Sequence, residues 1–228
     1  MVSLDLNTMT GEENIHVAAP EKWMNGWDSL YKRMLDASDE ELLEIEVGRP
    51  VQQLMHAFQI TETNLDGLKV LELASGDGSV GCYLGKLGCI VDCVGALTSA
   101  VAVANHKIKL LGLENTVHVK LEDIDGWTIE SAEYDVIIVL QSLQYLFERT
   151  IPRLQEILSA IKPGGFIVYS GNILPHFETD PPIRFITKDE LRKELTGWTL
   201  HCFGGDEAII KPNDLRGYVW TVARKPLK

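Results

Sequence analysis

The chain has 228 residues, of which 45% are hydrophobic and 24% are charged, and its formal net charge at pH 7 is −12. These values predict a soluble globular protein with one domain and, at most, a small additional part. Nucleic-acid-binding proteins usually carry a basic face, and the sequence has no cluster of Lys and Arg, so no nucleic acid is expected as a partner. No segment reaches the roughly 18 apolar residues of a membrane span, so no membrane association is expected.

The four cysteines, Cys82, Cys89, Cys93 and Cys202, include no C-x-x-C pair. Free thiols in a reducing compartment are the simplest interpretation. The N-terminal residues lack the basic flank and apolar core of a signal peptide, so a cytoplasmic location is predicted. No set of His, Cys and carboxylate residues has the spacing of a metal site, and no metal is predicted.

From Pro20 onward the sequence predicts an amphipathic helix, because large apolar residues recur at spacings of three and four. These residues are Trp23, Met24, Trp27, Leu30, Tyr31 and Met34. Two interpretations remain open: a helix packed on the main domain, or a lid whose aromatic face covers a substrate pocket. A second helical pattern runs from Val51 to Phe58. Residues 1–62 are therefore predicted to form an N-terminal tail and a helical cap, and residues 63–228 the main domain.

The main domain alternates between strand and helix patterns. Strands are predicted at 70–73, 89–94, 115–121, 134–140, 166–170, 198–203 and 217–223, and helices at 80–87, 99–111, 150–161 and 187–195. Thr150 and Thr187 are candidate N-caps of the last two helices. Alternation of this kind predicts a parallel sheet with right-handed crossovers, and the last two strands, which share a loop and no helix, predict an antiparallel pair at the edge. The expected fold class is α/β: a Rossmann-like, doubly wound, seven-stranded, mostly parallel sheet with an antiparallel edge strand and an N-terminal helical cap.

One stretch, Val70–Gly81, runs from an apolar strand into a glycine-rich turn and then into a helix. This order brings backbone N–H groups and a helix N-terminus close to a nucleotide-like ligand. Residues 76–81 fit G-x-G-x-x-G, which alone is compatible with NAD or FAD. However, Glu72 precedes the turn, where a carboxylate would repel a pyrophosphate. Gly95 and Ala96 stand where an NAD site needs an acidic residue for the ribose.

Four segments in order resemble the motifs of the class I S-adenosylmethionine-dependent methyltransferases. They are Glu72–Gly78, Val119–Ile124, Tyr134–Ile138 with the following residues 141–146, and Ile161–Gly165. The resemblance covers roughly residues 65–224, and Ala74 replaces the first glycine of the first motif. The closing segment, 185–198, is similar to small methyltransferases of the tellurite-resistance type.

The resemblance implies S-adenosylmethionine as the cofactor. Glu72 would attract its ammonium group, and the backbone from Gly76 to Gly78 would approach its methionyl and ribose parts. Asp123 would accept a hydrogen bond from the adenine amino group, while Leu97 and Ile124 would enclose the adenine ring. The complete predicted cofactor site is Glu72, Ala74, Ser75, Gly76, Gly78, Gly95, Ala96, Leu97, Asp123, Ile124 and Gln141.

Gly95 departs from the pattern of this family, which normally has an acidic residue there to bind both ribose hydroxyls. Asp92, three residues earlier, should point to the other face of the strand. Three interpretations remain open: another side chain serves the ribose, the cofactor binds weakly, or the fold has lost methyl transfer and serves another role.

The predicted function is methyl transfer to a small-molecule acceptor. Positioning and desolvation can supply much of the rate, so no general base is obligatory. His176, Tyr145 and Gln141 are the candidate catalytic residues: His176 is a possible base, and the other two would orient the acceptor. The alternatives are a binding or regulatory protein, and a lyase or cyclase that uses the same cofactor. A nicotinamide oxidoreductase is disfavoured by Glu72. The sequence does not indicate the oligomeric state.

Overall fold

The computed structural model describes residues 21–175, 183–211 and 214–228. The N-terminal part contains α1 (Glu21–Met34), α2 (Asp39–Leu43) and α3 (Arg49–Ile60). The helices that follow are α4 (Ser79–Lys86), α5 (Thr98–Leu111), the 3-10 helix η2 (Leu143–Arg149), α6 (Thr150–Ala160) and α7 (Lys188–Glu194). The strands are β1 (Lys69–Leu73), β2 (Ile90–Gly95), β3 (Val117–Leu121), β4 (Tyr134–Leu140), β5 (Ile161–Pro175), β6 (Thr199–Lys211) and β7 (Asp214–Arg224).

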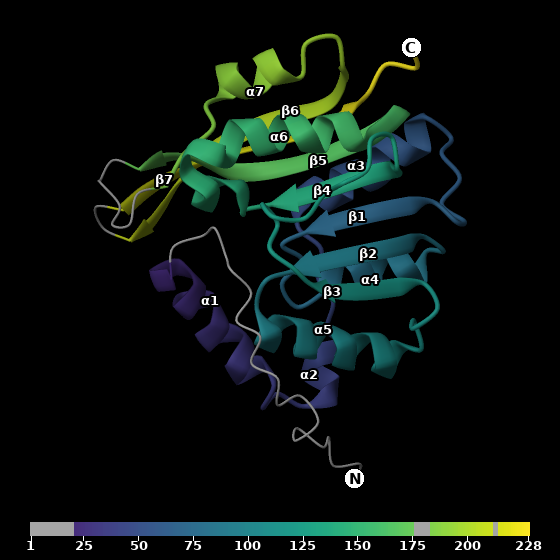
Figure 1. The fold of residues 1–228 in the computed structure, drawn as a ribbon, viewed down its shortest axis with the longest axis vertical. Coiled ribbons are helices and arrows are strands. Elements are labelled where there is room, and N and C mark those ends of the chain that lie inside the picture. The colour runs from purple at the N-terminus through teal and green to yellow at the C-terminus, as the bar shows by residue number, and fades with distance from the viewer. Residues whose placement is uncertain (1–20, 176–182, 212–213) are drawn as a thin grey trace.

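The strands form one seven-stranded sheet in the order β3-β2-β1-β4-β5-β7-β6. The first five strands in this order are parallel, and β7 runs antiparallel to both of its neighbours. The predicted fold class is therefore confirmed, and the last two strands form the expected antiparallel pair. Because β7 lies between β5 and β6, the outer strand at this edge is β6 (Figure 1).

Helices cover both faces of the sheet, and successive residues of each strand point to opposite faces. Leu71 and Leu73 belong to a core that includes residues of α6 and α7. Val70 belongs to a second core, together with residues of α3, α4 and α5. The central strand β4 is apolar on both faces, and its residues 136–139 are fully buried, as its continuous hydrophobic run predicted.

The predicted helical cap consists of two unlike parts. Helix α3 buries Leu54, Ala57 and Phe58 in the second core. Helix α1 has no buried residue and lies beside the carboxyl ends of the central strands (Figure 1). The division of the chain at residue 62 stays a prediction. Among the described residues, no helix is both long and apolar enough to cross a membrane.

Of the two predicted N-caps, only one is confirmed. Thr187 accepts a hydrogen bond from the N–H of Glu190, whose carboxylate accepts one in return, which forms a capping box. The prediction for Thr150 is wrong, because Arg149 occupies the cap position and the Thr150 hydroxyl donates to the carbonyl oxygen of Leu143 at 2.8 Å. The short helix α2 was not predicted, although Ser38 and Glu41 form a capping box at its start.

Candidate functional site

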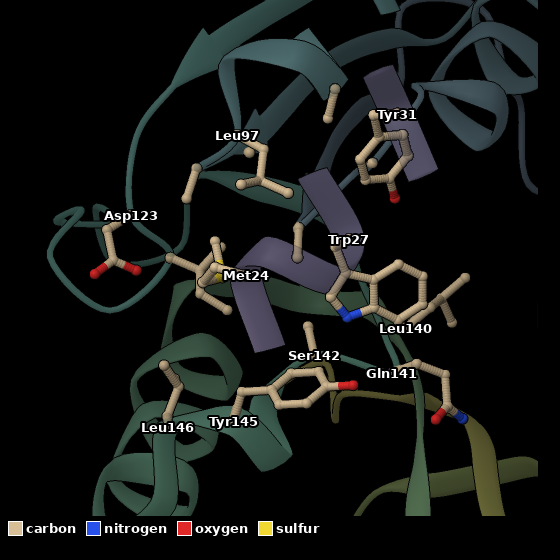
Figure 2. Close-up of a pocket in the computed structure, with 16 residues that line it drawn as sticks. Met24, Trp27, Tyr31, Leu97, Asp123, Leu140, Gln141, Ser142, Tyr145 and Leu146 are labelled. Atoms are coloured by element: carbon tan, nitrogen blue, oxygen red, sulfur yellow. The ribbon is translucent and has the colours of Figure 1, made fainter. Parts of the chain in front are cut away.

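A pocket opens beyond the carboxyl ends of β1, β2 and β4, where open α/β sheets usually bind their ligands. Its empty space is about 760 Å³, which includes space open to solvent. Most of the predicted site residues meet there: Ala74, Gly76, Gly95, Ala96, Leu97, Asp123, Ile124, Gln141 and Tyr145. The other lining residues are Met24, Trp27, Tyr31, Ala100, Leu140, Ser142 and Leu146 (Figure 2).

Three predicted cofactor residues, Glu72, Ser75 and Gly78, lie near the pocket without lining it. Ser75 and Gly78 are buried within the glycine turn. His176, the predicted base, lies outside the described residues.

Each glycine of the G-x-G-x-x-G motif has an identifiable role. Gly76 and Gly78 adopt φ angles of 55° and 70°, in the left-handed region where a side chain is disfavoured. A Cβ on Gly78 would also lie 2.8 Å from the Cβ of Ala104. Gly81 brings α4 close to the sheet, since a Cβ there would lie 3.3 Å from the carboxylate of Glu72. Ala74 also has a positive φ, 55°, at the position where the family has glycine.

Glu72 faces α4 because strand alternation puts it on the same side of β1 as Val70. Its Oε2 accepts a hydrogen bond from the N–H of Gly81 at 3.0 Å and lies 3.6 Å from Sγ of Cys93, its register partner on β2. Burial, followed by the negative charge of Asp77, raises the pKa of Glu72 from 4.5 to about 8. Glu72 is therefore largely protonated at neutral pH. It supports the glycine-rich turn through its hydrogen bond with Gly81, on the side of the turn away from the pocket.

We expect Glu72→Gln to flatten the dependence of stability on pH. A carboxyl whose pKa is higher in the folded state stabilises the protein fully below its unfolded pKa, and this contribution is lost as the pH rises toward 8. Between about pH 6 and pH 7.5 the wild type should lose up to about 2 kcal/mol of unfolding free energy that the variant retains. Urea denaturation of both proteins at several pH values measures this, and parallel curves would show that Glu72 is ionised throughout.

A buried lysine holds the glycine turn from the side. Lys107 on α5 is 2% exposed, and its Nζ contacts the carboxylate of Asp77 and lies 2.7 Å from Oγ of Ser79. The Ser79 hydroxyl donates to the same carboxylate at 2.9 Å. Sequence reasoning missed this network, although a signal was present: Lys107 follows Ala100, Val103 and Ala104 on the apolar side of the helix.

Gly95 ends β2 at the pocket wall and leaves open the space that a side chain would fill. A Cβ there would meet nothing closer than Oγ of Ser75 at 3.8 Å and Cγ2 of Val101 at 4.0 Å. Asp92 does not line the pocket and accepts a hydrogen bond from the hydroxyl of Tyr134 at 2.9 Å. It is therefore engaged elsewhere and does not replace the acidic residue missing at Gly95.

Helix α1 forms one wall of the pocket through Met24, Trp27 and Tyr31. It is attached to α5 by Asp28, whose Oδ1 accepts a hydrogen bond from the hydroxyl of Ser99 at 2.6 Å. Burial, followed by the charge of Asp77, raises the pKa of Tyr31 to about 12, so this hydroxyl stays neutral. The helix thus packs on the main domain, and its aromatic face also lines the pocket. Both structural arrangements that the sequence left open are therefore present together.

The end of β4 supplies uncharged polar groups. Gln141 has a φ of 55°, and its N–H donates to the carbonyl oxygen of Ser170 at 2.8 Å. Tyr145 packs against Trp23, with ring centroids 5.8 Å apart. Among the described lining residues, Asp123 is the only carboxylate, and there is no Lys, Arg or His. The other ionisable side chains that line the pocket are Tyr31 and Tyr145. Nor do three or more His, Cys, Asp or Glu residues of the described ranges cluster as a metal site requires.

Comparisons with known proteins agree with this geometry. Residues 70–165 match the family model described as a methyltransferase domain. TehB from Haemophilus influenzae has a TM-score of 0.62 and 20% identity, with 76% of this chain and 62% of TehB covered. Phosphoethanolamine N-methyltransferase 2 from Haemonchus contortus, solved with S-adenosyl-L-methionine, has a TM-score of 0.59 and 14% identity, with 77% of this chain and 52% of that protein covered.

The cyclase SpnF has a TM-score of 0.58 and 17% identity, with 77% of this chain and 81% of SpnF covered. By contrast, this chain spans less than two thirds of the length of TehB and of the N-methyltransferase. A search of curated protein sequences found no significant match. Identities this low show the fold alone, whereas the family match covers the glycine turn, the end of β2, Asp123 and the end of β4. Residues 70–165 therefore match a methyltransferase domain, and the chain has the fold of S-adenosylmethionine-dependent methyltransferases, which supports S-adenosylmethionine as the cofactor.

Proposed function

We propose that this protein transfers the methyl group of S-adenosylmethionine to a small-molecule acceptor in the cytoplasm. The observation that supports this most is the pocket, in which the glycine turn, the end of β2, Asp123 and the end of β4 meet under α1. Residues 1–62 would act as tail and cap, and the remaining residues would bind the cofactor.

The two ends of the pocket suit the two ligands. Asp123 lies at one end, and Trp27 and Gln141 lie at the opposite end (Figure 2). In the proposed site, Asp123, Ile124 and Leu97 hold the adenine, Gly76 borders the ribose and methionyl parts, and Gln141 and Tyr145 orient the acceptor. Glu72, Ser75 and Gly78 act indirectly, by supporting the turn.

When bound, S-adenosylmethionine supplies a methyl group on a cationic sulfur, which is already activated for in-line displacement. The residues of this chain then have to align the acceptor and exclude water. Trp27, Met24 and Leu140 provide apolar walls for this purpose. His176, the candidate base, lies outside the described residues, and an acceptor that needs little help with its proton, such as an amine or a thiol, suits in-line displacement without an obligatory base.

We expect Asp123→Ala to weaken binding of S-adenosylmethionine and S-adenosylhomocysteine about tenfold. Asp123 is 7% exposed and lines the pocket, and a hydrogen bond to a charged group contributes about 1.5–3 kcal/mol. Calorimetric titration measures the change. Asp125→Ala is the matched control, because Asp125 pairs with Arg149 at 3.2 Å and does not line the pocket. Equal affinities for the wild type and Asp123→Ala would mean that the adenine lies elsewhere.

Two alternatives share this fold and are separated by the product formed. Gly95 favours a binding or regulatory protein, which would bind S-adenosylmethionine weakly and release no S-adenosylhomocysteine with any acceptor. The fold is shared with the cyclase SpnF, so a cyclase is the second alternative. Such an enzyme would convert its substrate without consuming the cofactor. An assay of S-adenosylhomocysteine release across thiols, amines, phenols, and selenium or tellurium oxyanions tests the proposal against both. Failure to bind S-adenosylmethionine at millimolar concentration would overturn it.

A further inference from the structure

The acceptor end of the pocket has walls of one chemical kind. Two aromatic side chains, Trp27 and Tyr145, and the aliphatic Leu140 line it, and Met24 lies between this end and Asp123 (Figure 2). Trp23 packs against the ring of Tyr145 from outside the pocket and fixes its position. A flat, apolar molecule matches such walls, because aromatic side chains bury large apolar areas at little cost in conformational freedom.

The polar groups at this end are all uncharged. They are the amide of Gln141 and the hydroxyls of Ser142 and Tyr145. Ser142 is 6% exposed, and its Oγ has no hydrogen-bond partner within the described part of the chain. A buried hydroxyl without a partner is costly, so a ligand group that pairs with it would recover that loss.

The charges around the pocket disfavour a negatively charged acceptor. Among the described lining residues there is no cationic side chain, Asp123 lies at the far end, and the whole chain has a net charge of −12. The sulfonium of the cofactor can balance charge on the attacking atom itself. A permanent carboxylate, phosphate or oxyanion elsewhere on the acceptor would be desolvated without a partner, which is unfavourable.

We propose that the acceptor is a flat, apolar molecule that carries no negative charge and has one uncharged hydrogen-bonding group, and that oxyanions such as tellurite and selenite are not accepted. This inference rests on the proposed function and names its substrate class. Gln141 is the residue at which we expect the charge preference to be set, because it lines this end of the pocket and is uncharged, with its amide nitrogen 3.4 Å from Oγ of Ser170.

The test uses pairs of probes that differ only in a carboxylate: indole with indole-3-carboxylate, and aniline with 4-aminobenzoate. Each is titrated calorimetrically into the full-length protein saturated with S-adenosylhomocysteine, and S-adenosylhomocysteine formation is measured separately with each probe and with tellurite and selenite. We expect each neutral member to bind at least tenfold more tightly than its anionic partner. Gln141→Lys should remove or reverse this preference, whereas the neutral Gln141→Met should keep it.

Three results would overturn the inference: anionic probes that bind as tightly as neutral ones, methylation of either oxyanion, or no binding of any neutral probe at millimolar concentration. The initial titration of S-adenosylhomocysteine separates these failures from failure of the proposed function. If the cofactor product binds and the charge preference is absent, only the acceptor class is wrong.

Discussion

Gly95→Asp should bind S-adenosylmethionine about 100-fold more tightly than the wild type, which corresponds to about 2.8 kcal/mol. The carboxylate would stand at the end of β2, on the pocket wall, and would accept hydrogen bonds from both ribose hydroxyls. Two such bonds contribute about 1.5–3 kcal/mol each before the cost of desolvating the new charge is subtracted. The space is available, because a Cβ at Gly95 makes only ordinary contacts with Ser75 and Val101.

Two controls separate the carboxylate from the added bulk. Gly95→Ala adds the Cβ alone and Gly95→Asn adds a neutral side chain of the same size, so both should bind far less tightly than Gly95→Asp. The 2′-deoxy analogue of S-adenosylhomocysteine gives a second readout by calorimetry. Wild type should distinguish it poorly from the parent compound, and Gly95→Asp should distinguish it well. A loss of affinity in Gly95→Asp would mean that another group already serves the ribose from that space.

The sequence predicted the sheet, and it named residues that the structure brings together, because the determinants of both are local. The inner strands β1, β2 and β4 are short, mostly apolar runs, and the ligand-binding ends of parallel strands meet at one edge by topology. Gly95 ends β2, and Gly76, Asp123 and Gln141 follow β1, β3 and β4, so predicting the strands also brought these four residues together.

The features that sequence reasoning missed depend on contacts between distant segments. The direction of the Glu72 side chain is set by alternation along β1 and by the approach of α4, which Gly81 permits. The sequence motif gives only the residue type at Glu72. It does not show whether the carboxylate enters the pocket or points toward α4, where the structure places it. The contribution of α1 to the pocket depends on how this helix docks on α5, and its aromatic stripe fitted either interpretation until Trp27 and Tyr31 were placed.

Lys107→Met should destabilise the folded protein by about 3 kcal/mol and weaken cofactor binding at the same time. Removing one member of a buried ion pair leaves the other without compensation, which costs about 3–5 kcal/mol. The lower end applies here, since the side chain of Asp77 is 24% exposed and can be partly hydrated. The cation also holds Asp77 and Ser79 together at the start of α4, so its loss should loosen the turn that contains Gly76 and Gly78.

Urea denaturation and calorimetric titration of S-adenosylhomocysteine measure the two effects of Lys107→Met. Lys109→Met, an exposed position on the same helix, is the matched control and should change neither quantity. The double variant Lys107→Met/Asp77→Asn should recover more than half of the lost stability, because it no longer leaves a carboxylate unpaired. Its cofactor affinity should stay low, since the tie between α5 and the glycine turn is still missing. Full recovery of affinity in the double variant would show that Lys107 only neutralises Asp77, and that the turn holds its shape without it.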